Sequence, residues 1–71
     1  MMTNIIGKTV VYEEDAKQGV DYLKRMIDSH EAKVFFDQAF SRGSASFEDR
    51  MGYNYKLSLH GAEYLLEKKE Y

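Results

Sequence analysis

The strongest constraint on this chain is a two-residue alternation of apolar and polar side chains that starts after Gly43. The first run places Ala45 and Phe47 on one side. The second run carries on one side Tyr53, Tyr55, Leu57 and Leu59. A period of two is typical of a β-strand with one buried face, because successive side chains point to opposite faces of a sheet. The pattern therefore predicts two strands, over 45–49 and 53–60.

The two predicted strands fit a single hairpin register. A three-residue loop over 50–52 sets Asp49 opposite Tyr53 and Phe47 opposite Tyr55, so the two apolar sides coincide. The loop ends in a glycine, which tolerates the left-handed backbone that such loops need. A two-residue loop would instead place a lysine opposite Phe47, because a slip of one residue exchanges the faces of a strand. We therefore predict an antiparallel hairpin with a three-residue loop.

Residues 62–70 fit either a strand or a helix. As a strand after a His60–Gly61 turn, the segment sets Leu57 opposite Tyr64 and continues the apolar face without a break. As a helix, it is favoured by its Ala, Glu, Leu and Lys residues, which are strong helix formers. We favour the strand, because it completes a three-stranded antiparallel meander whose register already fits.

The N-terminal part of the chain predicts one strand and then a helix. Residues 4–12 are rich in β-branched and aromatic side chains and predict a strand in which Gly7 is a weak point. Three acids follow at 13–15, where a helix N-terminus favours negative charge. Helical spacing then begins at Ala16 and continues on the same face with Val20, Leu23 and Ile27.

A second helix is predicted directly after the first. Asp28 followed three residues later by Glu31 is a capping-box pattern, so the helix begins after Asp28. Gly43 stands where a left-handed C-terminal residue would end it. The predicted fold is a single α+β domain over 1–71, with an N-terminal strand, two short helices and the meander. The helices pack on one sheet face and leave the other in water.

Composition excludes several classes of function. The chain has 71 residues and no cysteine, which excludes disulfides, thiolate metal sites and cysteine nucleophiles. Ten basic residues against twelve acidic ones give a formal net charge of -2, which argues against binding to nucleic acid or anionic membranes through bulk charge. No apolar run approaches the roughly 20 residues of a membrane span and no targeting segment is recognisable, so we expect a cytoplasmic protein. Chains of this size and composition are common among bacterial and phage accessory proteins.

The side chains that could carry chemistry do not converge in the sequence. The stretch 6–9 resembles the end of a phosphate-binding loop, but Met2 stands where that motif needs a glycine. The two histidines, His30 and His60, are explained by a helix start and a turn. Neither has the nucleophile and the orienting group of a catalytic triad. We expect no catalytic residue, no cofactor, no metal site and no small-molecule substrate.

A small DNA- or RNA-binding regulator is the alternative function. Six tyrosines and four phenylalanines could stack on bases, but the predicted register puts Phe47 and Tyr55 on the face that the helices need for their core. The opposite sheet face has no aromatic platform. The two helices could also act as a helix-turn-helix, but the exposed face of the second is nearly neutral, whereas a groove-reading helix is normally supported by several phosphate contacts.

Several apolar side chains have no place in the predicted core, and they are the main indication of function. They are Tyr12, Tyr22, Met26, Val34, Met51 and Leu65, and Tyr71 is a further aromatic residue that we expect to be partly exposed. Exposed apolar groups and open sheet edges are natural contact surfaces for another chain. We therefore expect a non-enzymatic protein-interaction domain that acts away from membranes. It would bind a partner protein or a second copy of itself, as an inhibitor, antitoxin-like regulator or assembly subunit.

Overall fold

The alternation after Gly43 forms the hairpin that the sequence predicts. In the computed structural model, which describes residues 1–69, strand β3 (Ser44–Glu48) pairs antiparallel with strand β4 (Asn54–His60). Phe47 lies opposite Tyr55, as predicted. The loop between the strands is closed by the backbone N–H of Asp49, which donates to the carbonyl oxygen of Tyr53 at 3.0 Å.

The last segment is strand β5 (Glu63–Lys69), which confirms the strand and not the helix. Its predicted register is wrong by two residues, because Leu57 lies opposite Leu66 rather than Tyr64. The turn occupies residues 61 and 62, with Gly61 at a φ of 63°. Glycine at the first central position suits the type II′ turn, whose twist matches that of the flanking strands. A shift of two residues keeps every side chain on its face, so the apolar face is preserved.

The N-terminal segment is a hairpin rather than the single strand that the sequence predicts. Strands β1 (Met2–Ile5) and β2 (Lys8–Tyr12) pair antiparallel around a turn at Ile6 and Gly7. The φ angles of these two residues are 46° and 82°, so both central positions of the turn are left-handed. Isoleucine is strongly disfavoured in that conformation, which is why the residue pattern does not indicate a turn here.

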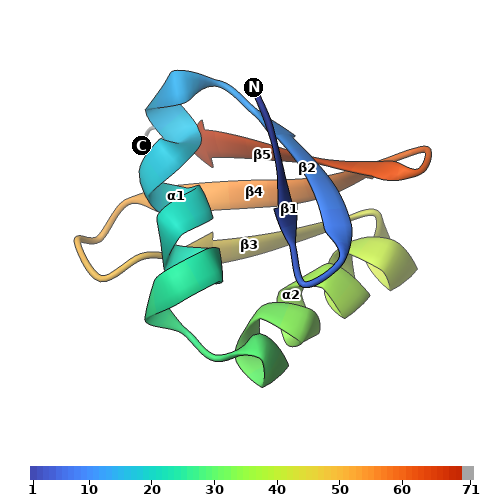
Figure 1. Ribbon diagram of the computed structural model, residues 1–71, viewed down its shortest axis with the longest axis horizontal. Coiled ribbons are helices and arrows are strands. Elements are labelled where there is room, and N and C mark those ends of the chain that lie inside the picture. Colours follow the sequence, from blue (N-terminus) through green and yellow to red (C-terminus); the bar gives the residue numbers. More distant parts are fainter. Residues whose placement is uncertain (70–71) are drawn as a thin grey trace.

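The five strands form one mixed sheet in the order β1-β2-β5-β4-β3. Strand β2 runs parallel to β5, with Val10 opposite Tyr64 and Tyr12 opposite Leu66, whereas the other neighbours are antiparallel. The three-stranded antiparallel meander is therefore one part of a larger sheet. Figure 1 shows how the β1–β2 hairpin joins this sheet beside β5.

The first helical segment changes its geometry along its length. It runs as a 3₁₀ turn (Glu14–Ala16), helix α1 (Lys17–Asp21) and a π-helical turn (Tyr22–Met26). Helix α2 (Ser29–Arg42) has both of the predicted ends. The Asp28 side chain accepts the backbone N–H of Glu31 at 2.9 Å, and Gly43 is left-handed with a φ of 91°.

The helices pack on one face of the sheet, called the inner face below, and the core lies between them (Figure 1). The predicted inward direction of Phe47, Tyr55 and Leu57 is confirmed, because all three side chains are buried in this core. Phe47 stacks between Tyr55 and Tyr22, with ring centroids 5.3 and 5.7 Å away.

Two aromatic side chains differ from their predicted positions. Phe40, expected on the flank of the apolar face of the second helix, is 69% exposed. Tyr53, expected on the inner sheet face, is also exposed, and the Lys68 Nζ lies 4.0 Å from its ring centroid. Within residues 1–69, no helix combines the length and the apolar character that crossing a membrane would require.

Candidate functional site

The loop from Asp49 to Tyr53 is organised by one buried carboxylate. The Asp49 Oδ1 atom accepts the backbone N–H groups of Met51 at 2.9 Å and Tyr53 at 3.0 Å. Its Oδ2 atom accepts the hydroxyl of Tyr55 at 2.9 Å. An aspartate that accepts backbone N–H groups two and four residues ahead holds the intervening chain in a turn. Met51 therefore projects from a loop with a defined conformation.

The end of the first helical segment faces this loop. The segment closes with the π-helical turn, a rare geometry that occurs frequently at functional sites. The Arg50 Nη2 atom donates to the backbone carbonyl oxygen of Met26 at 3.0 Å. A guanidinium at a helix C-terminus satisfies an otherwise unpaired carbonyl and favours the negative end of the helix dipole. This contact joins the helical segment to the loop.

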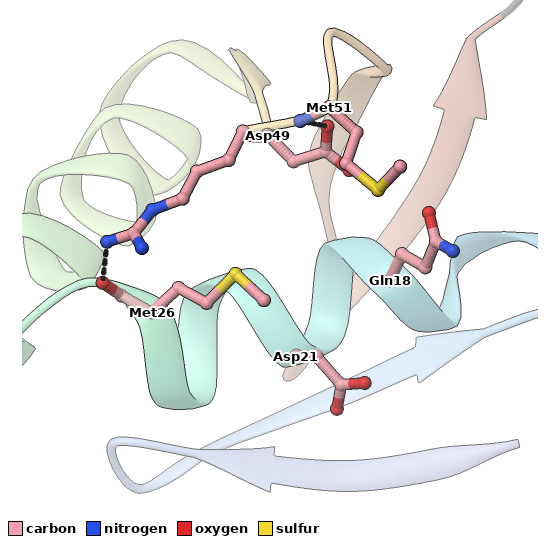
Figure 2. Close-up of a pocket in the computed structure, with 6 residues that line it drawn as sticks. Gln18, Asp21, Met26, Asp49 and Met51 are labelled. Carbon is pink, nitrogen blue, oxygen red and sulfur yellow. Dashed lines mark hydrogen bonds between the residues drawn. The ribbon is translucent and has the colours of Figure 1, made fainter.

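A cleft of about 210 Å³ lies between these two elements, and we call it the Met26–Met51 cleft. Gln18, Asp21 and Met26 line it from the helical side, and Asp49, Arg50 and Met51 line it from the loop. Figure 2 shows the side chains of Met26 and Met51 extending from opposite sides over the same space. Met26 is 48% exposed and Met51 is 72% exposed. Both thioethers are therefore accessible to a partner.

Tyr55 connects the two walls of the cleft from beneath. A Cβ atom added to Gly19 of α1 would lie only 2.7 Å from the Tyr55 ring, so helix and ring are in the closest contact that glycine permits. The hydroxyl of the same ring donates to Asp49. Burial raises the pKa of Tyr55 well above its ordinary value, and the hydrogen bond to the nearby Asp49 carboxylate raises it further. Tyr55 thus remains neutral at all ordinary pH values and keeps its donor role.

The Met26–Met51 cleft is suited to contact rather than to chemistry. Methionine is flexible and polarizable, so two thioethers adapt to apolar groups of different shapes. The volume is below the roughly 300–1,000 Å³ of typical small-molecule sites and fits a single apolar side chain better. Among the side chains of residues 1–69, no group of three or more His, Asp and Glu is placed to hold a metal ion.

The structure brings together only two of the six residues singled out in the sequence. Met26 and Met51 share the cleft, whereas Tyr12 and Tyr22 are half-buried against the core. Val34 lies alone on α2 and is 61% exposed. Leu65 is half-buried on the outer sheet face, where it pairs with Val11 of β2. Tyr71 lies outside the described residues.

Sequence reasoning missed four residues of the cleft: Gln18, Asp21, Asp49 and Arg50. A signal for Asp49 was present, because an aspartate two residues before a loop position and three before a glycine is typical of side-chain-capped turns. Gln18 and Asp21 gave no signal, since exposed polar residues of a helix carry no information about what lies opposite them.

Comparison of the chain with protein-family models, with curated proteins and with solved structures finds no match.

Proposed function

We propose that this protein is a non-enzymatic interaction domain that binds a partner protein by receiving one apolar side chain in the Met26–Met51 cleft. The observation that carries the proposal is the convergence of two exposed methionines, from separate elements, on one apolar cleft. Such a domain acts by occupying a partner surface, as an inhibitor, antitoxin-like regulator or assembly subunit.

The organisation of the cleft supports this role. Both walls are held by contacts that exist before any partner binds, through Asp49 in the loop and through Arg50 between loop and helix. A site that is already ordered loses less conformational entropy on binding, so more of the contact energy contributes to affinity. The methionine side chains remain the adaptable part of a site with a fixed backbone.

A protein partner fits this chain better than a nucleic acid. The rings of Phe47 and Tyr55 stack on each other inside the core, with centroids 5.3 Å apart, so they are not available to stack on bases. The formal net charge is -2, which supplies no general attraction to phosphates. Salt-sensitive retention of nucleic acid in a filter-binding assay at low salt would favour the DNA- or RNA-binding alternative instead.

The first test uses the four methionine methyl groups as reporters. With ¹³C-labelled methionine methyls, a dilute sample is titrated with N-acetyl-leucinamide, which offers one apolar side chain. We expect saturable shifts at Met26 and Met51. Met1 and Met2 are also exposed but do not line the cleft, so they serve as internal controls. Equal small shifts at all four methyls would show that the cleft has no preference for such a group.

The second test compares matched charge substitutions during capture of the native partner. Tagged wild-type, Met51→Glu and Val34→Glu proteins are purified from the host cell, and the bound proteins are quantified. Both substituted residues are highly exposed, so neither change should alter the fold. We expect the partner to be lost with Met51→Glu and retained with Val34→Glu. Equal retention by the two variants would contradict a role for the cleft.

A further inference from the structure

We infer that the side chain received by the Met26–Met51 cleft is Ile6 of a second copy of this chain. This inference rests on the proposed function and names the partner. Ile6 lies at the tip of the β1–β2 hairpin and is 40% exposed. The cleft and the tip are thus two parts of one interface, contributed by different copies.

The backbone at Ile6 is the first observation behind the inference. Ile6 is the one non-glycine residue with a positive φ among the described residues, and its φ is 46°. The left-handed region is unfavourable for a β-branched side chain, whereas asparagine or glycine occupies the same turn position readily. The turn is held in this conformation partly by Asn4, whose Oδ1 atom accepts the N–H of Gly7 at 3.0 Å. Strain of this kind at an exposed apolar tip points to a contact outside the chain.

The sizes of the two parts match. A two-residue turn presents one side chain at its tip, and Ile6 is that side chain. The cleft volume of about 210 Å³ admits one apolar side chain, and it is too small for a helix or a second strand. Two flexible thioethers line it and can close around a branched group.

The charges beside the two parts are opposite. Lys8 directly follows the turn, and Lys24 lies beside the same hairpin because its Nζ donates to the Thr3 hydroxyl at 2.9 Å. Asp21 lines the cleft, and its nearest cation, Arg25, is 3.8 Å away. Arg50 also lines the cleft, but its guanidinium is turned onto the Met26 carbonyl. Lysines beside the tip therefore meet an acidic rim rather than a repelling one.

The position of the two parts sets how copies would associate. Figure 2 shows the β1–β2 hairpin on one side of the helical segment and the cleft on its other side. Each copy can therefore give Ile6 to one neighbour while it receives Ile6 from another. Such a head-to-tail contact repeats along a chain or ring of copies and needs no reciprocal pair.

The test uses two variants that each destroy one part of the interface. Ile6→Asn removes the tip and relieves the strained turn, and Met51→Glu places a charge in the cleft. Sedimentation velocity over a wide concentration range should show association of the wild type, weakened at least about tenfold in each variant. Ile6→Asn should at the same time raise the melting temperature by about 5 °C. Val34→Glu on α2 is the matched control and should associate as the wild type does.

Mixing the two variants provides the decisive arm. Ile6→Asn keeps an intact cleft and Met51→Glu keeps an intact tip, so an equimolar mixture contains one working interface. We expect a 1:1 complex from two variants that do not associate alone. A wild type that stays monomeric at millimolar concentration, or a mixture that forms no complex, overturns the inference. The proposed function still stands in that case if N-acetyl-leucinamide shifts the methyls of Met26 and Met51.

Discussion

Two loops of this molecule join antiparallel strands, and their backbones are stabilised in opposite ways. The Asp49–Tyr53 loop places glycine at its left-handed position, Gly52, and satisfies its N–H groups with the Asp49 carboxylate. The Ile6–Gly7 turn places a β-branched residue at a left-handed position. The first loop presents Met51 without backbone strain, whereas the second presents Ile6 at a cost of about 1–2 kcal/mol.

This difference shows how much of a loop's stability comes from its support rather than from its tip. The Asp49 loop is connected to the core through Tyr55 and to the helical segment through Arg50. The Ile6 turn is held by its two strands and by a single side-chain acceptor, Asn4. Substitutions in the support of the first loop should therefore have large effects, and those at the tip of the second should have small or favourable ones.

The largest effect is expected for Asp49→Ala. This change removes three hydrogen bonds and leaves the buried hydroxyl of Tyr55 without its acceptor, so the free energy of unfolding should fall by about 3 kcal/mol. Urea denaturation measures the change. Glu48→Ala alters the exposed neighbouring acid and should stay within about 0.5 kcal/mol of the wild type. A similar loss in both variants would mean that the carboxylate does not organise the loop.

The next effect is expected for Gly19→Ala in helix α1. Helix propensity alone favours this change by roughly 1 kcal/mol. The new Cβ atom would lie 2.7 Å from the Tyr55 ring, and we expect this overlap to prevail, with a net loss of about 2 kcal/mol. Thermal unfolding followed by circular dichroism gives the sign directly. A gain in melting temperature would show that the contact between the helix and Tyr55 is loose. Gln18→Ala, at the exposed neighbouring position, is the control.

A smaller effect is expected for Tyr55→Phe, which keeps the ring and removes the hydroxyl. The free energy of unfolding should fall by about 1–2 kcal/mol, because one oxygen of Asp49 loses its donor. The pH dependence should also change. The pKa of Tyr55 is raised in the folded state, so its contribution is complete below the ordinary pKa of 10.0 and is lost as pH rises above that value. Wild-type stability should therefore decline more steeply above pH 10 than that of Tyr55→Phe.

The smallest effect, and the only favourable one, is expected for Ile6→Asn. Asparagine followed by glycine suits a turn with two left-handed positions, so stability should rise by about 1 kcal/mol. Gly52→Ala is the counterpart in the other loop, where a side chain must enter the left-handed region, and it should lower stability by about 1 kcal/mol. Opposite signs in chemical denaturation would confirm the contrast between the two loops, and equal signs would remove it.

The parts of the fold that the sequence predicted well are those set by neighbours in the chain. The β3–β4 register followed from the alternation together with the position of Gly52. Both ends of α2 followed from Asp28 and Gly43. The β4–β5 register was wrong by two residues, because both alternatives keep the same faces and only the turn geometry at Gly61 separates them.

The parts that it did not predict depend on distant segments. The N-terminal hairpin places Ile6 in a conformation that residue preferences disfavour, and the parallel pairing of β2 with β5 joins residues more than fifty positions apart. The cleft is of the same kind. Met26 and Met51 were each recognisable as surplus apolar residues, but their convergence follows from the packing of a helix end against a loop.

The sequence by itself determined the α+β class, the direction of the core side chains in β3 and β4, and the boundaries of α2, because periodicity, capping residues and glycines act over a few residues. Only the tertiary structure decided the five-stranded order of the sheet and the meeting of Met26 with Met51. Such contacts result from competition among many packings of the same apolar faces, and no local pattern of residues records which packing has the lowest free energy.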